Sequence, residues 1–209
     1  MKQKFRIYEI IAIAILALVF SFIAWHVRAG GVIGLDEYVK GMVKGLQTEK
    51  SLAFFSYFTK FGSEIGIVVT VVISMLVFWK KRYFAAFLIY PIAVISTHFI
   101  NQLLKVMIGR ERPSLNEAVD AVGYSFPSGH SMLAVVTYGF IAYMAIIHIN
   151  NKAGKFFITI AATIWIVWIG LSRVILNVHY PTDIIAGFCA GGIILIVAMY
   201  FNRFLHFTK

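Results

Sequence analysis

Long apolar runs recur along the whole chain, and they constrain its fold more than any other feature. A helix needs about 20 largely apolar residues to cross a bilayer, because it rises ~1.5 Å per residue through a hydrocarbon core ~30 Å thick. The chain is 60% hydrophobic and 13% charged, whereas a soluble domain carries about 25% charged residues. The sequence therefore predicts an all-α, polytopic integral membrane protein. The expected six-helix bundle has spans at Ile10–Val27, Ile65–Trp79, Tyr83–Leu104, Ser131–His148, Phe156–Leu171 and Ile184–Asn202.

No linker rich in Pro, Ser or Gly interrupts these runs, so residues 1–209 are expected to form one membrane-embedded domain. The first span follows a basic N-terminus, as a signal peptide does, but its apolar run is long and no small-x-small cleavage pattern follows. We expect it to remain as an anchor. Cys189 is the only cysteine, which excludes an intramolecular disulfide, and we expect it to be a small buried side chain.

The loop between the first two spans, residues 28–64, has structure of its own. Leu35, Val39, Met42 and Leu46 recur at helical spacing, and the polar positions between them include Asp36. This pattern predicts an amphipathic helix lying on the membrane surface. The aromatic run Ser51–Phe61 is too short to span alone, so it is expected to pack at the interface or to form part of a broken membrane segment.

The formal net charge of +10 comes from short clusters of Lys and Arg between the apolar runs. Clusters of this kind are typical of segments that flank membrane helices and do not indicate a nucleic-acid partner. The basic N-terminus (Lys2, Lys4 and Arg6) and the tight turn at residues 80–82 (Lys-Lys-Arg) place both termini in the cytoplasm by the positive-inside rule.

Span parity gathers several reactive side chains on one membrane face. Lys105 and Arg112 follow span three, His130 opens span four, Arg173 follows span five, and His179 and Asp183 precede span six. In an alternating bundle all four places lie on the same side. With the termini inside, that side is extracellular or periplasmic.

The same residues form three ordered blocks in the chain. The first is Lys105-x6-Arg112-Pro113, the second is Pro-Ser-Gly-His at residues 127–130, and the third is Ser172-Arg173-x5-His179-x3-Asp183. This pattern resembles the signature of the type 2 phosphatidic acid phosphatase superfamily, and all eleven fixed positions match in order. Size and topology resemble most the bacterial phosphatidylglycerophosphatase B type and its undecaprenyl diphosphate phosphatase relatives.

The residue types suit phosphate chemistry without reference to any family. A phosphate monoester carries close to two negative charges, which Lys105, Arg112 and Arg173 can neutralise. Ser128 and the amide of Gly129 can add donors where span four begins, because a helix N-terminus favours anions. The cations disfavour a divalent metal, so no metal and no cofactor are expected.

The resemblance implies that His179 is the nucleophile, forming a phosphohistidine, and that His130 is the general acid. Asp183, four residues after His179, is expected to contact the other ring nitrogen and to hold the tautomer. Pro181 is compatible with this arrangement if it lies in the first turn of span six. Arg110 is interpreted as a flanking residue, and His98 as a polar contact between helices rather than a catalytic group.

These features predict a metal-independent lipid phosphatase, with phosphatidylglycerophosphate as the first candidate substrate. Undecaprenyl diphosphate and phosphatidic acid are the alternatives, followed by a soluble sugar phosphate. A non-enzymatic anion transporter is the competing class, although it requires no paired His and Asp. The expected partners are a membrane phospholipid or polyprenyl phosphate and the bilayer, with no obligate protein partner.

Overall fold

The computed structural model of the chain describes residues 5–30, 34–114 and 121–206. Each regular element in these ranges is a helix. Their order is α1 (Ile7–Arg28), α2 (Gly34–Lys44), α3 (Glu49–Phe58), the short 3-10 helix η1 (Thr59–Gly62), α4 (Glu64–Lys80), α5 (Phe84–Ile108), α6 (Gly129–Ile147), α7 (Lys152–Ile175) and α8 (Pro181–His206).

Five helices, α1, α5, α6, α7 and α8, are each long and apolar enough to cross a membrane. The sixth candidate is a bent unit, in which residues 49–62 and α4 meet at 48° around Ser63. The prediction of a six-span helical membrane protein is confirmed. The predicted span Ile65–Trp79 corresponds to α4, and the aromatic run before it continues the same bent unit as α3 and η1.

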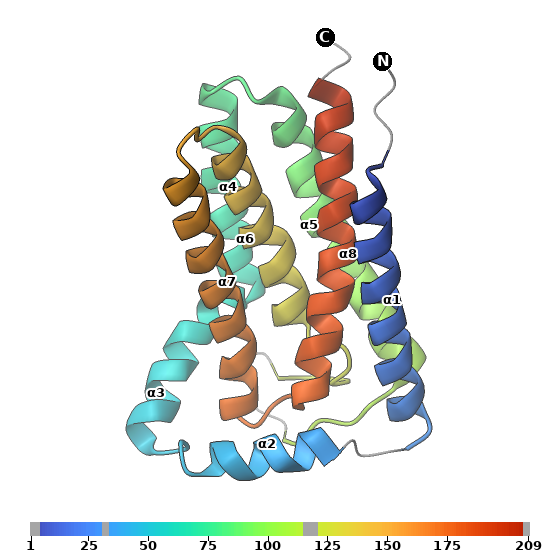
Figure 1. The fold of residues 1–209 in the computed structure, drawn as a ribbon. Helices are drawn as coiled ribbons and strands as arrows, with labels where there is room; N and C mark the ends of the chain where they lie inside the picture. The colour runs from blue at the N-terminus through green and yellow to red at the C-terminus, as the bar shows by residue number, and fades with distance from the viewer. Residues whose placement is uncertain (1–4, 31–33, 115–120, 207–209) are drawn as a thin grey trace.

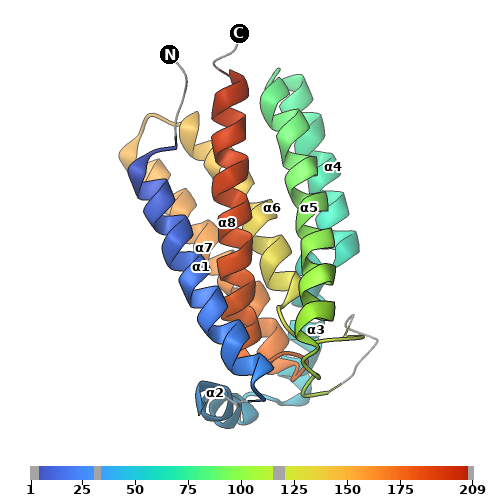
Figure 2. The same cartoon turned by 90° about the vertical axis from the view of Figure 1, so that its right-hand side faces the viewer.

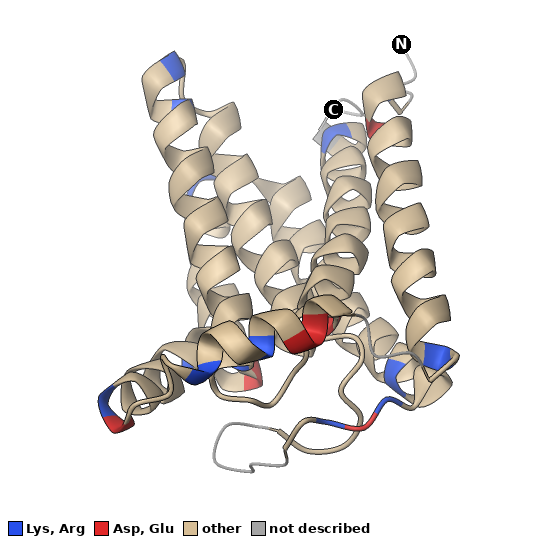
Figure 3. Ribbon diagram, turned by 60° about the horizontal axis from the view of Figure 1, so that its bottom comes forward, with Lys and Arg blue, Asp and Glu red and all other residues tan. Residues whose placement is uncertain are grey.

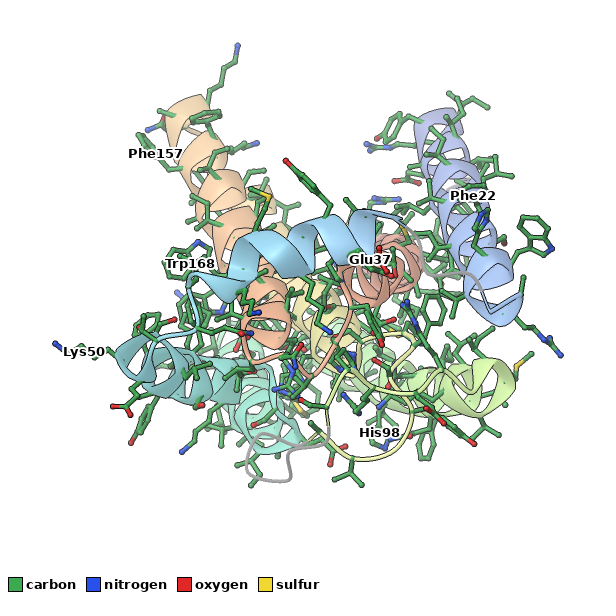
Figure 4. The ribbon with its side chains drawn as sticks, turned by 90° about the horizontal axis from the view of Figure 1, so that it is seen from below. Phe22, Glu37, Lys50, His98, Phe157 and Trp168 are labelled. Carbon is green, nitrogen blue, oxygen red and sulfur yellow. The ribbon has the colours of Figure 1, made fainter. Side chains whose placement is uncertain are left out.

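The bundle is organised around α6, which packs against α8, α7, α5 and α4. Of the most apolar 18-residue stretch of α6, 56% is buried inside the protein, against 11% of the corresponding stretch of α1. Helix α1 packs mainly against α8. The outer faces remain apolar, and Phe22 and Phe157 point away from the bundle (Figure 4). Outward apolar side chains are what hydrocarbon solvation requires.

Two glycines let α8 approach α6 closely. A Cβ atom at Gly187 would lie 2.8 Å from the Ser128 carbonyl oxygen, and one at Gly191 would lie 2.8 Å from the Met132 carbonyl oxygen. Small residues at such positions allow close packing of membrane helices. Gly187 and Gly191 therefore serve packing inside the bundle.

Both ends of the described chain lie at one end of the bundle, together with the turn between α4 and α5, whereas α2 crosses the opposite end (Figures 1 and 2). Charged residues gather mainly toward these two ends (Figure 3). Lys2 and Lys4, which contributed to the predicted orientation, lie outside the described residues.

The predicted surface helix is present as α2, but its buried side differs from the prediction. Val43 is buried in a cluster with Val174, Ile175 and Ile184 at the ends of α7 and α8. Asp36, one of the polar positions of this helix, is only 1% exposed. Periodicity does not reveal this burial, because the carboxylate accepts its hydrogen bonds from Thr182 on α8.

Candidate active site

Four separate segments bring the predicted site residues together at the α2 end of the bundle. They are the last turn of α5 with its following loop, the start of α6, the end of α7, and the turn from α7 into α8. Between them lies a cavity of about 390 Å³. Five predicted residues line it, namely Lys105, Arg112, Gly129, His130 and His179. Ser128, Arg173 and Asp183 are buried beside it.

The turn that carries His179 is built by backbone hydrogen bonds from both sides. The carbonyl of Arg173 accepts the N–H groups of Val178 (3.1 Å) and His179 (3.3 Å) after α7 ends. Helix α8 begins at Pro181, so this proline lies in the first turn as expected, where its missing N–H is tolerated. The Asp183 carboxylate accepts the Tyr180 N–H at 2.9 Å, as an acidic residue in the first turn of a helix commonly does.

His179 has partners at both ring nitrogens. Its Nδ1 lies 3.3 Å from Asp183 Oδ2 and 3.2 Å from Ser125 Oγ. Its Nε2 lies 3.0 Å from an Arg112 nitrogen, and a guanidinium can only donate. Nε2 is therefore the acceptor and Nδ1 carries the proton. The predicted contact between Asp183 and the second ring nitrogen is present in this geometry.

The charge state of His179 follows from its surroundings. Burial lowers the pKa of its imidazole to about 3, against the opposing effect of Asp183, and Arg112 and Arg173 lower it further. The ring is thus neutral at ordinary pH and keeps a lone pair on Nε2. A lone pair next to a cationic cavity is what attack on a phosphate requires.

His130 faces the same cavity under different conditions. It lies in the first turn of α6, only 8% exposed, and its buried Nε2 has no hydrogen-bond partner in the described part of the chain. Gly62 of η1 packs directly against the His130 ring. A Cβ atom at Gly62 would lie only 3.0 Å from His130 Cδ2 and 2.5 Å from Ile169 Cγ2. The imidazole is held by packing, and its polar edge is left for a ligand.

The three cations are fixed in different ways. Arg112 donates to the carbonyls of Val178 (2.9 Å), Gly123 (3.0 Å) and Val122 (3.1 Å), and burial lowers the pKa of its guanidinium. Arg173 is fully buried and donates to Thr59 Oγ1 at 2.9 Å. Lys105, in the last turn of α5, lines the cavity itself. Such a set favours an anion of high charge.

The two residues predicted as donors at the start of α6 differ in position, because Gly129 lines the cavity whereas Ser128 is fully buried and does not. Ser128 is the N-cap of α6, and its Oγ accepts the Ser131 N–H at 3.4 Å. Its own N–H donates to the Asp183 carbonyl at 3.1 Å, which ties α6 to α8. A Cβ at Gly129 would lie 2.8 Å from Asn101 Oδ1, so glycine is needed for α5 and α6 to meet here.

Arg110 is the main residue that the sequence interpretation missed, and its assignment as a flanking residue was wrong. Its guanidinium donates to Asp183 Oδ1 at 2.6 Å and to Asp36 Oδ2 at 2.7 Å, and it lies 3.9 Å from the centroid of the Tyr180 ring. Burial alone would lower the pKa of Arg110, but the two carboxylates outweigh it and raise the pKa. Arg110 is a buried bridge between two helices.

Asp36 and Ser125 were also missed. Asp36 accepts the Thr182 N–H at 2.9 Å and the Thr182 hydroxyl at 2.8 Å, so α2 is fastened to the first turn of α8. Ser125 donates to Asp183 Oδ2. The position of Arg110 between Lys105 and Arg112 was a usable signal, whereas Asp36 is 146 residues from Thr182 and gave none.

His98 pairs across helices, as its interpretation as an interhelical polar contact predicts. Its Nδ1 lies 3.4 Å from the Glu64 carboxylate at the start of α4, and both residues line the cavity. Figure 4 looks onto this end of the bundle, with His98 labelled and α2 crossing in front.

Comparisons with known proteins agree with this geometry. The family model described as the PAP2 superfamily matches residues 86–206. Phosphatidylglycerophosphatase B of Bacillus subtilis is 36% identical over 110 residues, which cover 52% of this chain and 54% of that protein. A lipid A 1-phosphatase of Rhizobium etli is 34% identical over 110 residues, covering 47% of this chain and 43% of that protein. The chain therefore spans about half the length of these curated relatives.

The similarity to a solved structure is more extensive. The crystal structure of a transmembrane PAP2 type phosphatidylglycerolphosphate phosphatase from Bacillus subtilis superposes with a TM-score of 0.80. The match covers 91% of this chain and 96% of that one, at 27% sequence identity. The similarity of fold therefore extends over most of the chain.

Proposed function

Because the chain belongs to the PAP2 superfamily, we propose that it is a lipid phosphatase that converts phosphatidylglycerophosphate into phosphatidylglycerol and inorganic phosphate. The similarity to phosphatidylglycerophosphatase B in sequence and structure supports this substrate. The observation that carries the proposal is the neutral His179, whose Nε2 faces a cavity lined by cations. Undecaprenyl diphosphate and phosphatidic acid are the alternative substrates.

In the first step, His179 Nε2 attacks phosphorus and the bond from phosphorus to the glycerol oxygen breaks. His130, protonated once the phosphate is bound, gives its proton to that oxygen and becomes neutral, and Asp183 stabilises the His179 ring through Nδ1–H. In the second step, His130 takes a proton from water, and the resulting hydroxide attacks phosphorus. The P–N bond breaks, phosphate leaves, and both histidines return to their initial states.

Arg112 couples binding to activation of the nucleophile. In the free protein it donates to the same Nε2 that has to attack. Phosphate oxygens are stronger acceptors for a guanidinium than a neutral imidazole is, so a bound phosphate draws this donor away. Substrate binding thereby frees the lone pair. Lys105 and Arg173 share the remaining charge and stabilise the transition state.

The reaction proceeds without a divalent metal in this proposal. Lys105, Arg112 and Arg173 supply the positive charge that a metal provides in other phosphatases, and they would repel a cation from the same cavity. No cofactor and no obligate protein partner take part.

The site faces the extracellular or periplasmic side of the cell membrane, with both termini in the cytoplasm. The support is the basic turn of Lys80, Lys81 and Arg82 at the end of the bundle that carries the termini. In a Cys189→Ala background, Glu37→Cys on α2 should react with an impermeant thiol reagent added to intact cells. Lys152→Cys should not react, and the reverse labelling pattern would refute the orientation.

A phosphate-release panel in detergent micelles tests the activity itself. The substrates are phosphatidylglycerophosphate, undecaprenyl diphosphate, phosphatidic acid and glucose 6-phosphate, each with excess EDTA. Release from phosphatidylglycerophosphate should be fastest and unaffected by the chelator, and vanadate should inhibit it. Release from the sugar phosphate alone would overturn the lipid assignment. Loss of activity in EDTA with recovery on added metal would overturn the metal-free mechanism.

A further inference from the structure

A second cavity, of about 420 Å³, lies at the opposite end of the bundle from the candidate active site. It opens where the start of α5, the end of α6 and the end of α8 meet near the start of α1. The polar and aromatic side chains that line it are Arg6, Tyr83, Tyr143, His148, Asn202 and Arg203. None of them lines the phosphate site.

Two neighbouring residues of α8 in this cavity have buried polar atoms without a partner. Asn202 is 5% exposed, and its Nδ2 contacts the Tyr143 hydroxyl at 3.4 Å and the Met144 sulfur at 3.7 Å. Its Oδ1 has no partner among the described residues, and neither has the Nε of Arg203. Most buried polar atoms are hydrogen-bonded, so two adjacent exceptions on one cavity wall indicate a site for a ligand.

The two unpaired atoms require opposite partners. The Nε–H of Arg203 needs an acceptor, and the amide oxygen of Asn202 needs a donor. Arg203 also holds Glu9 through its terminal nitrogen at 2.6 Å, so that pair is neutral overall. Arg6 adds a further positive charge at the cavity. The local charge therefore favours an anion.

We propose that this cavity binds the head group of a membrane phospholipid from the leaflet at the end of the bundle that carries the termini. The phosphodiester accepts from Arg203 Nε, and a hydroxyl or ammonium of the head group donates to Asn202 Oδ1. Ala85, Ala86 and Ile147 give the rest of the wall an apolar surface suited to the glycerol backbone. This cavity shares no lining residue with the candidate active site, so the proposal does not depend on the phosphatase assignment.

Lipids that differ in one donor test the proposal. Native mass spectrometry of the full chain, released from detergent micelles, measures retention of phosphatidylglycerol, phosphatidylethanolamine and phosphatidylcholine. The choline head group has the phosphodiester but no hydrogen to donate. Wild-type protein should bind the first two roughly 10-fold more tightly than phosphatidylcholine, which is the expected effect of one hydrogen bond to a charged or buried group.

Two variants separate the two contacts. Asn202→Leu removes the acceptor, so the preference over phosphatidylcholine should disappear. Arg203→Lys keeps a positive charge for Glu9 but lacks Nε–H, so all three lipids should bind about 10-fold more weakly. Lys152→Gln, which replaces an exposed cation of α7 that lines neither cavity, is the matched control and should change neither result. Circular dichroism checks that each variant keeps its helices.

Three outcomes would overturn the proposal. They are equal binding of all three lipids by wild-type protein, a lipid preference that survives Asn202→Leu, and loss of the bound lipid in Lys152→Gln. Glycerophosphoglycerol, the same head group without acyl chains, tests for a soluble ligand. If an equal concentration of glycerophosphoglycerol displaces the lipid, the ligand of this cavity is a soluble phosphodiester and not a membrane lipid.

Discussion

The two histidines of the candidate site differ in how many hydrogen-bond partners hold their rings before substrate binds. On the α8 side, His179 has partners at both nitrogens, and its carboxylate partner Asp183 is bound by Ser125, Tyr180 and Arg110. On the α6 side, the Nε2 of His130 is buried, and no described residue bonds to it. Both side chains are almost fully excluded from solvent.

This difference fits a division of labour. A nucleophile benefits from one fixed tautomer and orientation, because attack on phosphorus requires a precise lone-pair direction. A general acid has its partner on the substrate, and in the proposed mechanism the leaving oxygen is that partner. The unpartnered Nε2 of His130 thus suits a general acid, and the His179 ring, with partners at both nitrogens, suits a nucleophile.

Replacing either histidine should have the largest effect on turnover, and the two variants should differ in which step they block. His179→Ala should abolish turnover of both the lipid and an aryl phosphate. His130→Ala should lose at least ~10²–10⁴-fold on the lipid, whose glycerol oxygen needs a proton to leave. With an aryl phosphate, which leaves unaided, His130→Ala should release about one equivalent of aryl alcohol per site in a burst, because hydrolysis of the intermediate lacks its base.

The trapped phosphate identifies the nucleophile. It should be acid-labile and base-stable, as a P–N bond is, and peptide mapping should place it on His179. Steady turnover of the aryl ester by His130→Ala without trapped phosphate, or phosphate on another residue, contradicts the assigned roles.

Arg110→Gln should have the next largest effect, because it leaves the carboxylates of Asp183 and Asp36 buried without their shared cation. Breaking a buried ion pair by removing one partner costs about 3–5 kcal/mol. We expect kcat to fall by roughly 100-fold, a loss of ~2.7 kcal/mol, with little change in KM, since Arg110 is not among the residues that line the cavity. Steady-state kinetics and thermal unfolding in detergent check both parts. A large rise in KM with unchanged kcat would show that Arg110 binds substrate directly.

Asp36→Asn should have a smaller effect, because the amide keeps the shape and its oxygen can still accept from Thr182. We expect kcat to fall by about 10-fold, which corresponds to ~1.4 kcal/mol. In the double variant with Arg110→Gln the two losses should not add, since both act through Asp183. Additive losses would mean that α2 influences the site by another route.

The smallest expected change with pH is in the protonation state of His179. With a pKa of about 3, its ring should remain neutral, with the proton on Nδ1, from pH 7 to pH 4.5. Nitrogen-15 NMR of histidine-labelled protein should show this as a resonance that is absent from His179→Ala. Protonation near pH 6.5, the ordinary value for histidine, would contradict the burial argument.

The same shift has a consequence for stability. Because the folded pKa lies below the unfolded value of about 6.5, the unfolded chain takes up the proton first. The contribution of His179 to stability is therefore complete above that value and is lost progressively as the pH falls toward 3.

The sequence by itself determined the α-helical class, the number of spans, the helix α2 and the place of Pro181 in the first turn of α8. It also determined the common end of the bundle at which the reactive residues gather, namely Lys105, Arg112, His130, Arg173, His179 and Asp183. Apolar periodicity and span parity are local or one-dimensional properties, so they can be obtained from the order of residues alone. The motif spacing then identified the reactive groups.

Only the tertiary structure decided how those groups are held. Arg110 meets Asp36 across 74 residues and Asp183 across 73, and Asp36 meets Thr182 across 146. A charge at a span end has the same sequence pattern whether it faces the membrane surface or a buried carboxylate. What separates the two cases is burial, because a charge removed from water needs a specific partner, and which partner comes within reach is set by how the helices pack.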